Sequence, residues 1–243
     1  MKRSNHVTKT GLLAFSILLL ALTCKAQTRP PIVEQLAKTY GLDSFGQIDA
    51  IRYTFNIDAG PKKGSRSWIW EPKADRVTFD GKDKAGNPVK VTYVRSQVAS
   101  QPDNVKKDVD PAFINDSYWL LLPLHVYRDT SADVQDKGKQ KLPIGKGSAR
   151  HLVVKYGAEG GYTPGDTWEL YLGPDNRIQE MVFHHGGDAK PKLVLAPWAG
   201  YKQAGPLLIS TEHRATADGK PAHVFFTNVA VKLSGSDNWV EAK

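Results

Sequence analysis

The sequence has little cysteine, since Cys24 is the only one among 243 residues. Cys24 lies in an N-terminal segment, residues 1–26, that has the three parts of a secretory signal peptide. The segment holds the basic residues Lys2, Arg3 and Lys9, the mostly apolar run 11–22, and a small residue, Ala26, before Gln27. Cleavage after Ala26 leaves a chain without cysteine, which excludes disulfides and thiol catalysis. Such a chain must be held together by its core alone.

Cys24 raises the alternative of a lipoprotein that is cut before this cysteine and lipidated on it. The residues before it, Ala21-Leu22-Thr23, match the usual run-up to such a cysteine poorly. The apolar run is also shorter than the roughly 20 residues that a membrane-spanning helix needs. We therefore expect a periplasmic or secreted protein, cleaved after Ala26, with an anchor at Cys24 as the alternative.

The sequence lacks a strong charge of one sign once the leader is set aside. The whole chain carries a formal charge of +8, and four basic residues of the leader account for half of it. The remaining basic residues are scattered, whereas nucleic-acid binding needs a clustered basic patch. We expect no nucleic-acid partner; a weak attraction to an anionic membrane surface stays open. Residues 27–243 have the length of a single domain, so we expect a signal peptide, 1–26, and one β domain, 27–243.

Short catalytic motifs are absent as well. The sequence has neither a G-x-S-x-G elbow nor an HExxH metal motif. The glycine pairs Gly160-Gly161 and Gly186-Gly187 are not followed by a helical pattern, so we interpret them as turns, and we expect no cofactor.

What the sequence does contain is strand pattern. Apolar and polar residues alternate over 51–58, the period of a half-buried strand. Comparable stretches are Ser65–Trp70, Arg76–Asp80, Val89–Arg95, Ala149–Tyr156, Thr167–Leu172, Ile178–His184, Lys192–Tyr201, Leu207–Ala217 and Ala222–Leu233. Turn residues such as Asp175-Asn176 and Asp218-Gly219 join several of them as hairpins. About ten antiparallel strands are predicted, with 129–146 as a long polar loop.

Two helices are predicted beside these strands. The first covers Ile32–Gly41, which has apolar residues on one face. The second covers Asp116–Leu122, capped by Asn115 or Asp116 and ended by Pro123. It is apolar nearly all round and should be buried. A sheet of ten strands must curl, close or split, so we predict a mainly β fold: a strongly curved antiparallel half-barrel with short helices covering its open mouth.

Three stretches carry a resemblance to a known family. They are Trp68-Ile69-Trp70-Glu71-Pro72, the segment from Asp110 to Pro123 around Trp119, and Trp168-Glu169-Leu170-Tyr171-Leu172 with its Asp175-Asn176 turn. The series resembles secreted bacterial proteins of the LolA/LolB-like lipoprotein-carrier superfamily over roughly 46–233. The resemblance implies a half-open antiparallel barrel in which helices cover an apolar cavity that holds lipid or acyl chains.

The predicted cavity follows from strand alternation. Trp68 and Trp70 share one face of their strand, as do Trp168 and Leu170. If Leu172 pairs with Arg177 across the turn, Trp168 lies opposite Met181. We expect the ligand-binding residues to be Trp68, Trp70, Trp119, Trp168, Leu170 and Met181, because Trp, Leu and Met suit an adaptable apolar site.

Two other classes of protein remain open at this point. A secreted hydrolase would use the carboxylates Glu169 and Glu180, opposite each other in the same register, or a zinc site built from His184, His185, His213 and His223. A carbohydrate-binding module would need Trp68 and Trp70 on an exposed face. The main hypothesis is a non-enzymatic periplasmic carrier, a monomer, whose partner is a hydrophobic small molecule or lipid. Envelope lipoproteins and the membrane surface are further candidate partners.

Overall fold

A computed structural model describes residues 29–83, 85–158, 163–186 and 193–243. The predicted signal peptide, Cys24 and the pair Gly160-Gly161 lie outside these residues. No helix in the described ranges is both long and apolar enough to cross a membrane.

Thirteen strands form one sheet. They are β1 (Ile48–Ala59), β2 (Lys62–Glu71), β3 (Arg76–Lys82), β4 (Pro88–Val94), β5 (Asp133–Lys141), β6 (Ser148–Lys155), β7 (Thr167–Leu172), β8 (Ile178–His184), β9 (Leu193–Pro197), β10 (Ala199–Ala204), β11 (Leu207–Ala217), β12 (Lys220–Leu233) and β13 (Trp239–Glu241). Their order is β4-β3-β2-β1-β12-β11-β9-β8-β7-β6-β5, with β10 beside β11 and β13 beside β12, and every pair is antiparallel.

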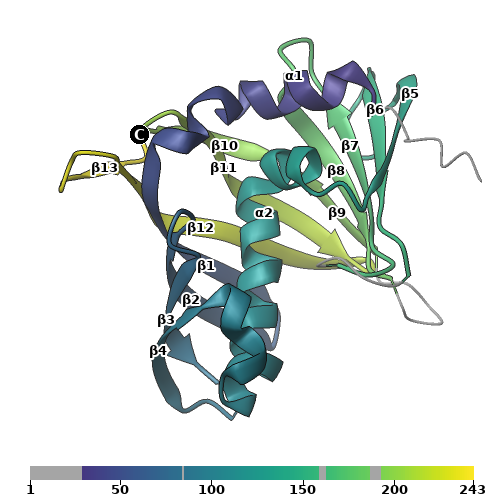
Figure 1. Cartoon of the computed structure of the whole chain (residues 1–243). Coiled ribbons are helices and arrows are strands. Elements are labelled where there is room, and N and C mark those ends of the chain that lie inside the picture. The colour runs from purple at the N-terminus through teal and green to yellow at the C-terminus, as the bar shows by residue number, and fades with distance from the viewer. Residues whose placement is uncertain (1–28, 84, 159–162, 187–192) are drawn as a thin grey trace, which may run out of the picture.

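The sheet is strongly curved and does not close (Figure 1). The predicted mainly β, antiparallel, half-barrel fold is therefore confirmed. One cause of the curvature lies in the central strands, where Thr54 pairs with Thr227 but Arg52 pairs with Ala230. Two residues of β12 thus face one residue of β1, and a bulge of this kind bends a sheet. Asn228 in the bulge has a φ of 54°, a conformation that asparagine tolerates better than most residues.

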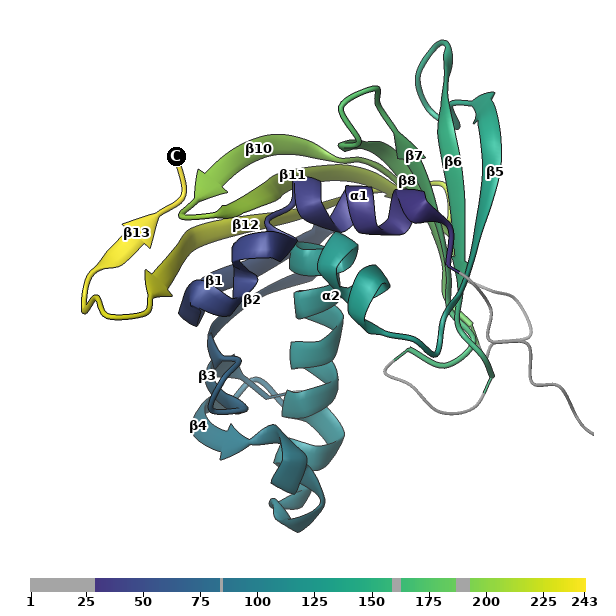
Figure 2. The same ribbon diagram turned by 45° about the horizontal axis from the view of Figure 1, so that its top comes forward.

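Two α-helices occupy the concave side of the sheet, α1 (Pro31–Thr39) and α2 (Asp110–Arg128) (Figure 2). Shorter helical turns are η1 (Leu42–Gln47), η2 (Arg95–Ser100) and the π-helical η3 (Val105–Val109), which runs into α2. Helix α1 buries Ile32, Val33 and Leu36, the face predicted from the sequence.

Helix α2 is longer than predicted. It begins at Asp110 and continues through Pro123 to Arg128, with non-helical backbone angles at Leu121. A proline removes one helical hydrogen bond and crowds the preceding turn, which kinks a helix that surrounding contacts hold in place. Neither Asn115 nor Asp116 caps the helix, because both lie within it.

Two further corrections concern strands. The predicted loop 129–146 contains β5, a polar strand at one edge of the sheet, where the absence of an apolar alternation hid it. The predicted strand Lys192–Tyr201 is divided at Trp198 into the end of β9 and the start of β10. The main core lies between the concave face and the helices, as a single cluster of buried apolar residues.

Candidate functional site

The predicted ligand-binding residues lie together on the concave side, within the main core. Trp68, Trp119, Trp168, Leu170 and Met181 are buried, and Trp70 is half-buried against Phe45 and Phe113. Trp68 and Trp70 therefore do not form an exposed platform, so the alternative of a carbohydrate-binding module that stacks sugars on them is wrong. The concave face is apolar, as predicted, and helix α2 packs against it (Figure 1).

Trp119 occupies the centre of this packing. Its ring centroid lies 5.6 Å from that of Trp168 and 5.6 Å from that of His213. Trp198 stacks on it at 6.2 Å with an interplanar angle of 11°. One side chain of α2 thus joins strands β7 and β11 and the β9–β10 junction. We name Trp119, Trp168, Trp198 and His213 the aromatic cluster.

The aromatic cluster encloses nitrogen atoms that have no hydrogen-bond partner of good geometry among the residues that the structure describes. These are Nε1 of Trp168 and both ring nitrogens of His213. Leaving a buried polar group unpaired costs about 1–3 kcal/mol. Burial lowers the pKa of His213 to about 3, while hydrogen bonding to the backbone at Pro197 and Ser210 opposes this shift. The imidazole is therefore neutral at physiological pH.

Sequence reasoning placed His213 in the wrong kind of site and missed Trp198. The alternation along β11 was the available signal, because Glu212 and Arg214 point outward while His213 and Ala215 are buried. His213 and His223 lie on the paired strands β11 and β12, but His213 is paired with Val224 and His223 with Arg214. Neighbouring positions on a strand point to opposite faces.

The N-terminal half of α2 is tied to the sheet by Asp116. Its carboxylate accepts hydrogen bonds from Arg66 Nε at 2.7 Å, from Arg66 Nη2 at 2.6 Å and from Trp68 Nε1 at 2.9 Å. Burial raises the pKa of Asp116, while the hydrogen bonds and charge of Arg66 oppose this shift. Because Arg66 and Trp68 belong to β2, these contacts fix the helix to that strand.

A second carboxylate, Asp110 at the start of α2, repeats this arrangement. It accepts a hydrogen bond from the Tyr93 hydroxyl at 2.8 Å and one from Arg95 Nε at 3.0 Å. Tyr93 lies on β4 and Arg95 begins η2. The first half of α2 is therefore bound by charge to the β1–β4 side of the sheet.

The C-terminal half of α2, beyond the kink at Leu121, is held in a different way. Residues Leu122, Leu124 and Val126 are buried, and the guanidinium of Arg29 donates to the carbonyl oxygens of Val126 and Asp129. Arg29 lies just before α1, so Arg29 and α1 secure this end of α2.

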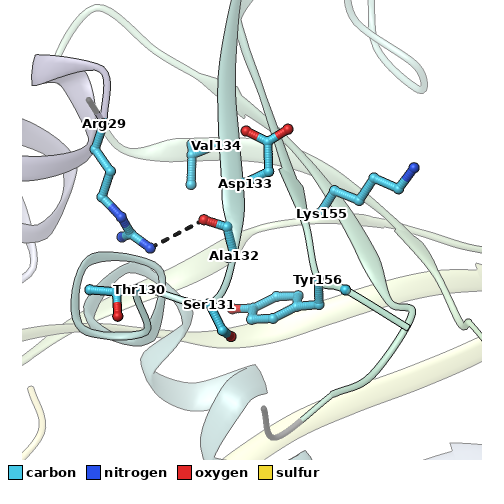
Figure 3. A pocket seen from close by; sticks show the side chains of 9 residues that line it. Arg29, Thr130, Ser131, Ala132, Asp133, Val134, Lys155 and Tyr156 are labelled. Carbon is cyan, nitrogen blue, oxygen red and sulfur yellow. Dashed lines mark hydrogen bonds between the residues drawn. The ribbon is translucent and has the colours of Figure 1, made fainter. Parts of the chain in front are cut away.

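A surface hollow of about 500 Å³ lies beside Arg29 (Figure 3). The Arg29 guanidinium points toward the carbonyl oxygen of Ala132, 3.4 Å from Nη2, whereas the Lys155 side chain points away from Ala132. Tyr156 forms part of the wall and Asp133 lies at the rim. None of the residues that line the hollow belongs to the aromatic cluster or to the predicted ligand-binding set, so the hollow is not the predicted apolar cavity.

The predicted β7–β8 register is wrong. Leu170 pairs with Met181 and Trp168 with Phe183, two residues away from the expected pairing. Three residues lie in the loop between Gly173 and Arg177, and the Gly173 N–H donates to the Arg177 carbonyl oxygen at 2.8 Å. A bulge near Gln179 adds one extra residue to β8. A shift of two residues preserves the faces, so Trp168 and Met181 still share the concave side.

The same register separates the two carboxylates that a hydrolase would use. Glu180 is opposite Tyr171, and it accepts hydrogen bonds from the backbone N–H groups of Ile144 and Gly145, both at 2.8 Å. Glu169 instead lies 2.8 Å from His184 Nε2 and 2.9 Å from His151 Nε2, the latter without hydrogen-bond alignment. Each carboxylate therefore has its own separate partners on the outer face.

The predicted zinc site is not assembled either. His185 contacts Asp166 at 3.1 Å, whereas His223 contacts Glu212 at 2.7 Å. Within the part of the chain that the structure describes, no three metal-binding side chains come together in a group that could hold an ion.

Comparisons with known proteins concern the fold. No protein-family model matches the sequence, and no curated protein matches it. A DUF1329 family protein from Desulfovibrio piger is similar at 11% identity and a TM-score of 0.44, covering 86% of this chain and 96% of its own. A LolA superfamily protein from Nitrosomonas europaea is similar at 8% identity and a TM-score of 0.45, covering 84% of this chain and 93% of its own. The solved structures similar to this chain thus include a DUF1329 family protein and a LolA superfamily protein.

Proposed function

We propose that this protein binds a lipid or acyl chain reversibly between the concave face of the sheet and helix α2, and carries it without any covalent step. The ligand takes the place of Trp119 and its neighbours against Trp168, Leu170 and Met181. Trp68 and Trp70 line the adjoining part of the same face. The observation that carries this proposal is the central position of Trp119 among rings whose buried nitrogens have no well-aligned hydrogen-bond partner in the described part of the chain.

The chemistry of α2 supports such an exchange. The segment Tyr118–Leu122 is buried and mostly apolar, so an acyl chain can replace its contacts with contacts of the same kind. Burial of an acyl chain contributes about 0.8 kcal/mol per CH₂, or about 10 kcal/mol for twelve of them. Unpaired nitrogens make the closed cluster less stable than an ordinary core. Together these effects allow a ligand to compete with the helix.

The unequal anchoring of α2 supports a hinge at its kink. The carboxylates of Asp110 and Asp116 hold the first half to the sheet, whereas Arg29 and α1 hold the second half. Movement of α1 with the second half uncovers the apolar residues beyond the kink, Leu122, Leu124 and Val126. The first half stays in place, so the Trp119 side chain makes room for the ligand by rotating on a fixed backbone. In this proposal the helices act as a lid.

The proposed setting is the bacterial envelope, outside the cytoplasm. A leader cleaved after Ala26 releases a soluble carrier, whereas lipidation at Cys24 produces a membrane-bound receiver. Determination of the N-terminal residue after expression in a Gram-negative host separates the two. We expect Gln27 as the N-terminal residue. A lipidated Cys24 at the N-terminus would instead make the protein a membrane-bound receiver.

Binding is tested on protein purified without detergent. Native mass spectrometry is expected to show bound lipid, and a fluorescent fatty-acid probe is expected to bind the delipidated protein. Trp119→Ala should change probe affinity at least severalfold. The matched control is Trp239→Ala, since Trp239 lies on β13 against Arg52, away from the cluster. Absence of both bound lipid and probe binding in the folded protein would overturn the proposal.

A further inference from the structure

The β5–β6 hairpin carries lysines that have no acidic partner. Four exposed residues form this set, which we name the lysine group: Lys137, Lys139, Lys141 and Lys146. None of them forms an ion pair with a carboxylate of the described residues, whereas several exposed lysines elsewhere do, such as Lys38 with Glu34 at 2.9 Å. The positive charge of this hairpin is therefore not balanced within the described part of the molecule.

Two carboxylates that reach the hairpin are already engaged. Asp136 accepts hydrogen bonds from Arg150 Nε at 3.0 Å and from Arg150 Nη2 at 2.5 Å, and Glu180 accepts two from the backbone of the loop between the strands. The segment 137–150 itself contains no aspartate or glutamate. Lys139 lies opposite Arg150 in the pairing of β5 with β6, and like charges in such positions repel each other. An anionic partner placed against the hairpin relieves this repulsion.

The loop at the end of the hairpin, residues 142–147, displays an apolar side chain. Ile144 is 51% exposed, the highest value among the large apolar residues that the structure describes. The loop around it is held in place, because Leu142 packs against a second apolar cluster around Tyr171 and its N–H donates to the Gly147 carbonyl oxygen at 3.1 Å. A loop that is fixed in this way loses little conformational entropy when it binds a partner.

The position and chemistry of the loop favour one kind of partner. In the view of Figure 2 the free end of the hairpin projects beyond the rest of the sheet, and Lys141 and Lys146 flank Ile144 there. One protruding apolar residue supplies little of the apolar core of a protein–protein interface, and nucleic acid offers phosphates without an apolar phase. A bilayer with anionic headgroups offers both a negative surface and an apolar interior.

We propose that the free end of the β5–β6 hairpin docks on a bilayer that contains anionic phospholipids. The lysine group lies against the headgroup phosphates, and Ile144 enters the boundary between headgroups and acyl chains. Docking is reversible, because its electrostatic part weakens as the ionic strength rises. The inference goes beyond the proposed function, since it concerns the outer surface and needs no ligand in the core.

The test measures co-sedimentation of the processed protein, purified without detergent, with vesicles. Vesicles of phosphatidylglycerol mixed with phosphatidylcholine should bind the protein, and vesicles of phosphatidylcholine alone should not. Raising the ionic strength from about 0.05 M to about 0.5 M should release the bound protein, because the screening length falls roughly threefold.

A double variant tests the lysine group. Lys141→Gln with Lys146→Gln keeps the hairpin polar and should lower the partition coefficient into the anionic vesicles about twentyfold, since each lysine beside such a surface contributes about fivefold. The matched control, Lys106→Gln with Lys107→Gln, removes the same charge from η3 and should change the coefficient less than twofold.

A single variant tests the apolar tip. Ile144→Ser should lower the same partition coefficient about threefold to tenfold, because about half of this side chain is still available for burial. The control, Val240→Ser, changes an exposed apolar residue on β13 and should have less than a twofold effect. Circular dichroism checks that each variant is folded, and if Ile144→Ser does not fold, the lysine double variant decides.

The outcomes separate this inference from the proposed function. Equal binding to both kinds of vesicle, an equal loss in the two double variants, or no binding at low ionic strength would each overturn the docking site. The hairpin variants should bind a fluorescent fatty-acid probe as the wild type does when no vesicles are present. Loss of vesicle binding with intact probe binding concerns the docking site alone, whereas vesicle binding by a protein that binds no probe would overturn only the carrier.

Discussion

Asp116 and Arg66 form a bidentate ion pair between helix α2 and strand β2, with N–O distances of 2.7 Å and 2.6 Å. The carboxylate is fully buried, while the Arg66 side chain keeps 28% of its exposure. Trp68 Nε1 donates a third hydrogen bond to the same carboxylate. This arrangement fixes the N-terminal half of α2 to strand β2.

Removal of this carboxylate should destabilise the protein strongly. Breaking a buried pair by removing one partner costs roughly 3–5 kcal/mol. For Asp116→Ala we expect the lower end, about 3 kcal/mol, because Arg66 is partly exposed and can regain water. Chemical denaturation measures the change. Asp103→Ala, which removes an exposed carboxylate paired with Lys106 and Lys107, should cost less than 1 kcal/mol; a similar loss in both variants would contradict the role of burial.

His213 should make the stability of the protein depend on pH in acid. Its pKa falls from 6.5 in the unfolded chain to about 3 in the folded one. Below pH 6.5 the unfolded state therefore binds a proton that the folded state does not, and stability decreases as the pH falls toward 3. The slope is up to about 1.4 kcal/mol per pH unit for this one group. His125, whose pKa burial lowers to about 4, acts in the same direction.

His213→Phe should remove its share of this dependence. Denaturant titrations at several pH values between 6 and 4 should show a slope that is smaller by about 1.4 kcal/mol per pH unit. The His125 contribution should remain in the variant. Identical slopes in the wild type and in His213→Phe would show that the buried imidazole is protonated in the folded state.

Arg29 should control the C-terminal half of α2 alone. Its guanidinium donates to the carbonyl oxygens of Val126 and Asp129, and to that of Tyr127 at 3.1 Å. Arg29→Ala leaves these acceptors without the charged donor, with a cost of about 1–3 kcal/mol. Hydrogen exchange should therefore accelerate after Leu121 and stay unchanged around Asp116. Equal acceleration in both halves would argue against a hinge at the kink.

Much of the fold could be predicted because alternation is a local property. The pattern of β7 placed Trp168 and Leu170 on the concave side, and a register error of two residues did not change that. The register itself depended on a bulge near Gln179, which has no apolar pattern to reveal it. Asp116 was predicted as a helix cap because aspartate suits that position. Its actual partner, Arg66, lies 50 residues away, and a tertiary contact of this kind leaves no local signal.

Strand β5 is a second feature that has no local signal in the sequence. Its sequence, Asp133–Lys141, has one buried residue and many charges, so it was predicted as a loop. It forms a strand because β6 supplies hydrogen-bonding partners along one side. A polar, lysine-rich strand is typical of a sheet edge, where it opposes pairing with another molecule.

The lysines of β5 should therefore keep the protein monomeric. Lys139 and Lys141 lie on this edge, next to the irregular pairing between Asp136 and Lys139. The double variant Lys139→Val, Lys141→Val makes the edge more apolar and more strand-forming, so we expect dimers or larger species by analytical ultracentrifugation. The double variant Lys106→Val, Lys107→Val removes the same charge from η3, away from the sheet edge, and should stay monomeric. Only the Lys139→Val, Lys141→Val variant changes a sheet edge that another strand can extend. Self-association of both double variants would therefore indicate a general effect of lost charge and would contradict a specific role of the β5 edge.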